Sequence, residues 1–135
     1  MKSLFAVVLL SMFCAASLPV KAQETPMEQV IASQLDAFRA DDFVTAFSFA
    51  SPMIQNLFGS PANFGVMVKR GYPMVWRPSD VRYLGAQMRG GALWQDVMIR
   101  DLEGRVHIVE YEMIEGENGW KINGVRLRAP GAGTA

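Results

Sequence analysis

The spacing of apolar residues changes once along this chain, near residue 80, and this change constrains the fold more than any other feature. Before it, apolar residues recur every three or four positions, as on one face of a helix. The clearest run is Met27, Val30, Ile31, Leu35 and Phe38. Between residues 81 and 128, apolar and polar residues alternate, as in strands with one buried face. The pattern predicts an α+β fold, with N-terminal helices packed on a curved four-stranded antiparallel sheet.

Three helix starts are marked by a capping residue followed by proline. A hydroxyl at such a position can accept a hydrogen bond from a free backbone amide, and proline suits the first helical residue. At the first start, Glu28 completes a capping box with Thr25. The three pairs are Thr25-Pro26, Ser51-Pro52 and Ser60-Pro61.

The remaining helix boundaries follow from other residue types. Asp41 or Asp42 is expected to cap a further helix, and Gly59 and Gly71 are expected to end two of them. Residues 72–78 are predicted to run extended, because two of them precede prolines and are biased away from helical angles.

Four strands are predicted in the second half, at residues 81–88, 92–100, 105–115 and 120–128. Gly124 is expected to mark a bulge in the last one. A four-residue turn at 101–104 would pair Arg100 with Arg105. With side chains alternating between faces, this register places the following residues on one face, against the helices: Trp94, Asp96, Met98, His107, Val109, Tyr111, Met113, Trp120 and Ile122.

The first 22 residues have the features of an export signal. Lys2 is followed by an apolar run from residue 4 to 13, and Val20 and Ala22 suit cleavage before Gln23. The run is shorter than the roughly 20 residues a membrane span needs. We therefore expect an exported protein, periplasmic or secreted, with no membrane attachment after cleavage. It would comprise a signal peptide (1–22), one α+β domain (23–128) and a flexible tail (129–135).

The amino-acid composition argues against several classes of function. Basic and acidic residues are balanced at 13 each, which argues against nucleic acid as a partner. The single cysteine, Cys14, lies in the export signal, so the mature chain has no thiol for a disulfide, a metal or a nucleophile. One histidine and scattered carboxylates give no metal-binding motif. No cofactor and no metal site is predicted.

Four stretches of the chain resemble a known family. The ending Gly119-Trp120-Lys121-Ile122-x-Gly124-Val125 resembles the last strand of nuclear transport factor two and ketosteroid isomerase, which implies their cone-shaped, cystatin-like fold. More narrowly, the chain resembles short exported bacterial proteins that carry a domain of unknown function. No catalytic residues are assigned to that family, so the resemblance carries none over to this chain. The other matching stretches are residues 34–38, 46–52 and 71–76.

Three residues are candidates for catalysis if the expected register holds: Asp96, His107 and Tyr111. A carboxylate in an apolar pocket has a raised pKa and can act as a base or an acid, and a tyrosine hydroxyl can stabilise an oxyanion. That is the chemistry of isomerases with this fold. The structural alternatives are an Asp96 paired with Arg82 or Arg100, a His107 half-exposed beside the turn, and a Tyr111 in the core.

A second group of candidates is aromatic. Tyr72, Trp76 and Trp94, together with Arg77, could hold a small apolar or anionic ligand. The alternative is that these rings close the open end of the cone.

These observations leave three functions open. The leading hypothesis is a small-ligand-binding or protein-interaction module that uses the cone cavity or the sheet face. A second is a small isomerase or dehydratase with Asp96 and either Tyr111 or His107. A third is a homodimerisation module, for which Val97, Ile99 and Ile108 would form the outer face of the sheet.

Overall fold

A computed structural model of the protein describes residues 24–129. The predicted signal peptide and all but the first residue of the predicted tail lie outside these residues. Five helices precede four strands, as the change in apolar spacing predicts. The helices are α1 (Pro26–Arg39), α2 (Phe43–Ser48), α3 (Pro52–Phe58), α4 (Pro61–Gly71) and α5 (Pro73–Trp76), and the strands are β1 (Asp80–Arg89), β2 (Ala92–Arg100), β3 (Val106–Gly116) and β4 (Gly119–Leu127).

The capping residues stand where the sequence predicts them. Both hydrogen bonds of the capping box between Thr25 and Glu28 are present at the start of α1. The side chains of Asp42, Ser51 and Ser60 accept from amides in the first turns of α2, α3 and α4. Local hydrogen bonding therefore sets most of the helix boundaries.

One prediction in the helical half is wrong. The segment predicted to run extended contains a single helical turn, α5. Pro73 occupies its first position, where a missing N–H costs nothing and the fixed φ suits a helix. The bias against helical angles holds only for the residues before the prolines, since Tyr72 and Arg77 both have φ −135°.

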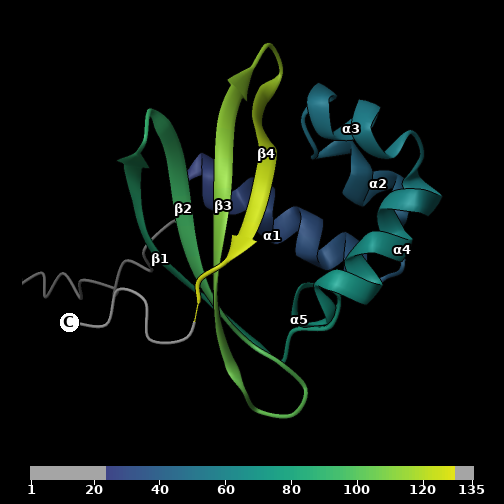
Figure 1. Cartoon of the computed structure of the whole chain (residues 1–135), viewed down its shortest axis with the longest axis vertical. Coiled ribbons are helices and arrows are strands. Elements are labelled where there is room, and N and C mark those ends of the chain that lie inside the picture. Colours follow the sequence, from purple (N-terminus) through teal and green to yellow (C-terminus); the bar gives the residue numbers. More distant parts are fainter. Residues whose placement is uncertain (1–23, 130–135) are drawn as a thin grey trace, which may run out of the picture.

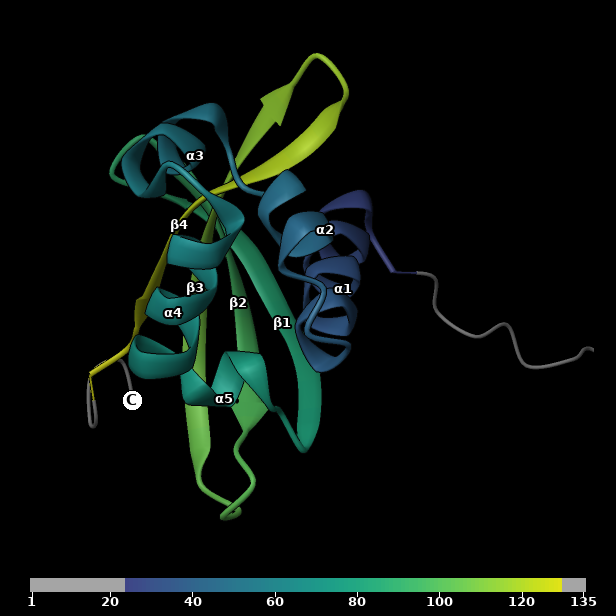
Figure 2. The ribbon, with the colours of Figure 1, turned by 90° about the vertical axis from the view of Figure 1, so that its right-hand side faces the viewer.

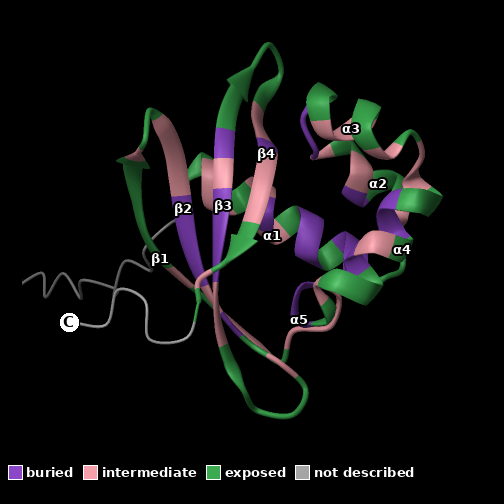
Figure 3. Cartoon of the chain, in the orientation of Figure 1, coloured by how far each residue is buried: buried purple, intermediate pink, exposed green. Residues whose placement is uncertain are grey.

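All five helices lie on one side of the sheet, which is antiparallel with the order β1-β2-β3-β4 (Figures 1 and 2). The arrangement is consistent with the cone-shaped fold named above. Buried residues gather along β2, β3 and one face of α1 (Figure 3). Within residues 24–129, no helix has the length and apolar composition that crossing a membrane requires.

The register between β2 and β3 differs by one residue from the prediction. Arg100 pairs with Val106 rather than with Arg105, because the turn contains five residues. The Asp101 carboxylate accepts hydrogen bonds from the amides of Glu103 and Arg105 at 2.9 Å, which stabilises the longer turn. Such a slip moves every β2 side chain to the other face.

As a result, the predicted faces are correct for β3 and β4 and wrong for β2. Val109, Tyr111, Met113 and Ile122 are buried beneath the helices, as predicted. Trp94, Asp96 and Met98 lie on the opposite, outer face. In their place, the inner face carries Gln95, Val97 and Ile99, all at most 1% exposed. The predicted bulge is present in β4, where the pairing with β3 shifts between Gly124 and Ile122.

We predict that neighbouring β2 residues differ in their contribution to stability. Ile99→Ala removes a fully buried side chain and should lower the free energy of unfolding by about 2–5 kcal/mol. Met98→Ala, on the half-buried outer face, should cost less than about 1.5 kcal/mol. Urea denaturation of both variants measures the difference. A larger loss for Met98→Ala than for Ile99→Ala would contradict the observed register.

Candidate functional site

A cavity of about 210 Å³ lies between the helices and the inner face of β3 and β4. Its buried end is formed by aromatic and aliphatic side chains, with the ring of Phe64 5.9 Å from that of Phe38 and 5.8 Å from that of Phe58. Toward solvent, the wall is made by residues of α3 and α4, among them Leu57, which is 71% exposed. The cavity is lined by Gln34, Phe38, Ala50, Ile54, Leu57, Phe58, Phe64, Met67, Val68, Tyr72, Val75, Tyr111, Ile122, Gly124 and Val125.

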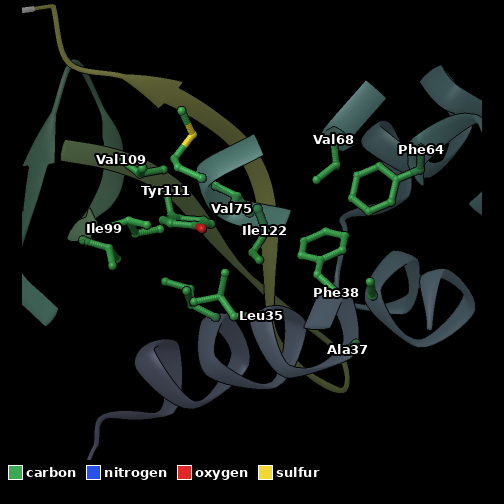
Figure 4. Close-up of a cluster of buried hydrophobic side chains, with 14 of the residues drawn as sticks. Leu35, Ala37, Phe38, Phe64, Val68, Val75, Ile99, Val109, Tyr111 and Ile122 are labelled. Carbon is green, nitrogen blue, oxygen red and sulfur yellow. The ribbon is translucent and has the colours of Figure 1, made fainter. Parts of the chain in front are cut away.

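The Tyr111 hydroxyl is the most unusual group in this wall. Among the buried side-chain nitrogen and oxygen atoms of residues 24–129, it alone has no hydrogen-bond partner. Its oxygen points away from Ile99 and Val109, into the space toward Ile122 and Phe38 (Figure 4). An unmade hydrogen bond of this kind costs about 1–3 kcal/mol, so the native state carries a buried hydroxyl whose hydrogen bond is unmade.

Burial also lowers the acidity of this hydroxyl. The side chain is 0% exposed, and its burial raises the pKa of the Tyr111 phenol above its ordinary value. Near neutral pH the group therefore keeps its proton and is a hydrogen-bond donor.

Two other cavity residues have polar side-chain atoms, and both are held by the backbone. Gln34, on the buried face of α1, donates from Nε2 to the carbonyl of Ala46 at 3.1 Å. This bond ties α1 to α2. Tyr72, at the junction of α4 and α5, donates from its hydroxyl to the carbonyl of Val125 at 3.2 Å. Both side chains are thus fixed in place as parts of the wall.

The elements that carry Tyr111 also explain its position. It pairs with Gln95 of β2 on one side and with Val125 of β4 on the other, in the middle of the sheet. Alternation along β3 turns its ring to the helices together with Val109 and Met113. The bulge at Gly124 lies beside it and shifts the register of β4.

Asp96 does not share this site, contrary to the prediction. It lies on the outer face, where Arg89 donates to it at 2.9 Å and Arg128 at 2.7 Å. Burial alone would raise the pKa of the Asp96 carboxyl, but the hydrogen bonds from Arg89 and Arg128 outweigh it and hold that pKa below its usual value. A carboxylate held ionised between two guanidinium groups is a poor general base. The correct partners are arginines other than the expected Arg82 or Arg100.

Glu110 sits beside Asp96 and completes an ionic cluster on the outer face. Arg128 donates to Glu110 at 3.0 Å, and Arg126 donates to it as well. Here too burial acts to raise the pKa of the carboxyl, and the two arginines lower it overall. The carboxylates are 5–6% exposed, so the cluster is a buried structural feature whose charges are already paired.

His107 lies apart from both groups. Its Nε2 is 2.8 Å from Oδ2 of Asp101 in the β2–β3 turn. Together with Arg77 and Arg105 it borders a second hollow, of about 330 Å³, between α5 and that turn. Arg77, Arg105 and His107 each already have a carboxylate partner among the described residues. The three candidates for catalysis are therefore on three different parts of the molecule.

The predicted ligand-binding residues are also separated. Only Tyr72 lines the apolar cavity. Trp76 and Arg77 both donate to the carboxylate of Asp41, at 2.9 Å, and link α5 to the end of α1. Trp94 is on the outer face, contrary to the predicted register, with the Arg126 guanidinium 4.0 Å from its ring centroid.

The sequence alone did not identify Gln34, or the aromatic residues at the buried end of the cavity, as site residues. A signal for Gln34 does exist, because it falls on the helical stripe with Ile31, Leu35 and Phe38 and is a polar residue on an apolar face. No comparable signal marks Phe64 or Val68, whose spacing indicates only that they face the core. Within residues 24–129, no three His, Cys, Asp or Glu side chains gather as a metal ion would need.

The fold and the cavity define the class: an α+β protein whose helices enclose an apolar hollow against one face of an open antiparallel sheet. The chain belongs to the family described as Domain of unknown function (DUF4864), which matches residues 20–134. A similar solved structure is the solution structure of a SEC-C motif containing protein from Rhodopseudomonas palustris. It is 15% identical, with 76% of this chain and 78% of that chain covered and a TM-score of 0.55. This likeness concerns the fold alone. A search of curated proteins found no match.

We predict that Tyr111→Phe raises the free energy of unfolding by about 1 kcal/mol, because it removes a buried hydroxyl that has no partner. Tyr83→Phe is the matched control, since Tyr83 is half-buried and does not line the cavity; its effect should stay within about 0.5 kcal/mol. Urea denaturation measures both. A loss of stability in Tyr111→Phe would mean that the hydroxyl has a partner in solution, such as a bound water.

Proposed function

We propose that this protein binds a small, largely apolar ligand in the cavity between α3, α4 and β4. The observation that carries the proposal is the cavity itself: of its fifteen lining residues, only Gln34, Tyr72 and Tyr111 have nitrogen or oxygen in their side chains. Apolar cavities of about 150 Å³ stay dry and take up benzene. A volume of about 210 Å³ therefore suits a single aromatic ring or a short hydrocarbon chain.

Binding is better supported than isomerase chemistry. An isomerase or dehydratase needs an ionisable group beside the substrate to move a proton. The lining contains no carboxylate, histidine or lysine, and Asp96 is on the far side of the sheet. A tyrosine with a raised pKa can hold a substrate, but it is a weak acid for proton transfer near neutral pH.

The structure weakens the argument for a homodimer. Two of the three residues expected on the outer face, Val97 and Ile99, are fully buried beneath the helices. Only Ile108 remains from that set, beside an ionic cluster whose charges are paired. The cavity is thus the better supported site of action.

Filling the cavity should abolish binding. Val68 lines it from α4, whereas Val66, two residues earlier, is 48% exposed and does not. With ethylbenzene at about ten times its Kd, thermal unfolding of the wild type and of Val66→Phe should shift upward on the order of 5 °C. Val68→Phe should show no shift. The proposal fails if ethylbenzene, tested to its solubility limit, leaves the wild-type melting temperature unchanged.

We also propose that the protein acts outside the cytoplasm. The support is the charged residue, apolar run and small-residue cleavage pattern of the first 22 residues, together with a family match that begins at residue 20.

When the full chain is expressed in a Gram-negative bacterium, mass spectrometry of the periplasmic fraction should find a protein that begins at Gln23. Leu9→Arg, which places a charge in the apolar run, should leave the unprocessed chain in the cytoplasm, whereas Lys21→Arg should be processed normally. Recovery of the uncleaved wild-type chain from the cytoplasm would refute export.

A further inference from the structure

We infer that the protein docks reversibly on a lipid bilayer through the end of the molecule that α2, α3 and α4 form. The inference goes beyond the proposed function, because docking does not require the cavity to hold a ligand. It uses the folded domain rather than the export signal, so the expectation of no membrane attachment after cleavage is revised to a reversible contact.

The first step is the absence of charge from this part of the chain. Residues 43–68 contain no lysine, arginine, histidine, aspartate or glutamate, although 19% of the whole chain is charged. They form α2, α3 and most of α4, which lie together at the end of the molecule away from β1 (Figure 1). We call the exposed side chains of residues 43–68 the uncharged surface.

The second step is the exposure of large apolar side chains on the uncharged surface. Met53 and Leu57 are four positions apart on α3 and so share one face of that helix; they are 57% and 71% exposed. Val44 of α2 and Val66 of α4 are exposed as well. None of the α3 residues is buried, so packing in the core does not explain why this helix is so apolar.

Elsewhere in residues 24–129, most of the exposed large apolar residues stand next to a charged residue in the chain. Leu102, for example, lies between Asp101 and Glu103 in the β2–β3 turn. Single apolar residues of this kind are normal on a protein surface, whereas a continuous apolar patch marks a docking site. The others with a charged neighbour are Met88, Val106, Ile114 and Leu127.

The third step identifies the partner. The apolar cavity opens beside α3, with Leu57 and Met67 in its wall toward solvent. With the uncharged surface on a bilayer, this mouth faces hydrocarbon, and an apolar molecule can enter without crossing water. Protein–protein interfaces are enriched in arginine and have a polar rim, whereas a charge in hydrocarbon is strongly unfavourable. The absence of charge therefore suits a bilayer better than a protein partner.

Cationic side chains at the border of the uncharged surface suit contact with lipid headgroups. Lys121 of β4 donates to the carbonyl of Ser48 at 2.8 Å, and the Nζ of Lys69 is 4.9 Å from the ring centroid of Phe43. The carboxylate of Asp42, also at this border, is engaged as the N-cap of α2. Lysines in such positions can extend to headgroup phosphates while the helices between them contact the acyl chains.

The test uses the processed chain, which begins at Gln23 and contains all the described residues, with no added ligand. Vesicles of phosphatidylcholine with a minority of phosphatidylglycerol are sedimented, and the bound fraction of protein gives a partition coefficient. Met53→Asp places a charge on α3 at a residue outside the cavity lining. The matched control is Leu102→Asp, because Leu102 is 73% exposed and lies in the β2–β3 turn.

The wild type should bind these vesicles, and Met53→Asp should lower its partition coefficient by about tenfold, because a carboxylate is unfavourable where an apolar side chain enters the bilayer. Leu102→Asp should leave the coefficient within about twofold of the wild type. Both variants should keep the wild-type melting temperature, since both sites are exposed.

A second measurement locates the contact without adding a charge. Cys14 lies in the export signal, so the processed chain has no other cysteine. Met53→Cys and Leu102→Cys therefore each supply a single thiol for an environment-sensitive dye. On addition of vesicles, the emission of the dye at position 53 should shift to shorter wavelength, and the emission at position 102 should not.

Three outcomes would contradict this inference. If the wild type does not bind the vesicles, there is no docking. If Met53→Asp and Leu102→Asp weaken binding equally, the contact is not through α3. If light scattering shows a wild-type dimer that Met53→Asp dissociates, the uncharged surface joins two copies of the chain instead. Vesicle binding as expected, together with no effect of ethylbenzene on the melting temperature, would sustain this inference while the proposed function fails.

Discussion

A pair of backbone hydrogen bonds joins the helical half of this protein to its last strand, and the cavity depends on it. The amide of Ile122 donates to the carbonyl of Phe49 at 2.9 Å, and the amide of Ser51 donates to the carbonyl of Ile122 at 2.8 Å. Ser51 is 0% exposed, and its hydroxyl also donates to Asn123 at 2.8 Å. Since buried amides and carbonyls must be paired, this junction holds the start of α3 against β4. The helices beyond it then cover the sheet and leave the cavity between α3, α4 and β4.

The two faces of the sheet carry side chains of different chemical character. Its inner face is mostly apolar and carries Tyr111, which in the part of the chain that the structure describes has a buried hydroxyl without a partner. Its outer face holds Asp96 and Glu110 among arginines that satisfy them. Each carboxylate is buried and has at least two arginine partners, and a buried carboxylate without such partners would be destabilising, so this cluster has a structural role that accounts for its strong electrostatics. A search for perturbed carboxylates alone would lead to the wrong face of the sheet.

Much of the fold could be predicted because the signals are local. A capping side chain is within three residues of the amide it serves, as at Thr25 and Ser60, and a glycine at a helix end acts on its own backbone. The turn between β2 and β3 shows the limit of such signals. Its composition indicates a turn, but whether it has four or five residues depends on two amides that both donate to Asp101. The one additional residue in this turn decides which face of the sheet carries Asp96.

From the sequence alone, one can derive the order of helices and strands, most of their boundaries, and the inward direction of Tyr111 and Ile122, because these follow from periodicity and capping. The tertiary structure decided the rest: that Asp96, His107 and Tyr111 lie on separate parts of the molecule, and that a hollow remains between Phe64 and β3. The physical reason is that a cavity, and a buried hydroxyl left without a hydrogen-bond partner, are properties of how distant surfaces fit together. No stretch of neighbouring residues contains that information.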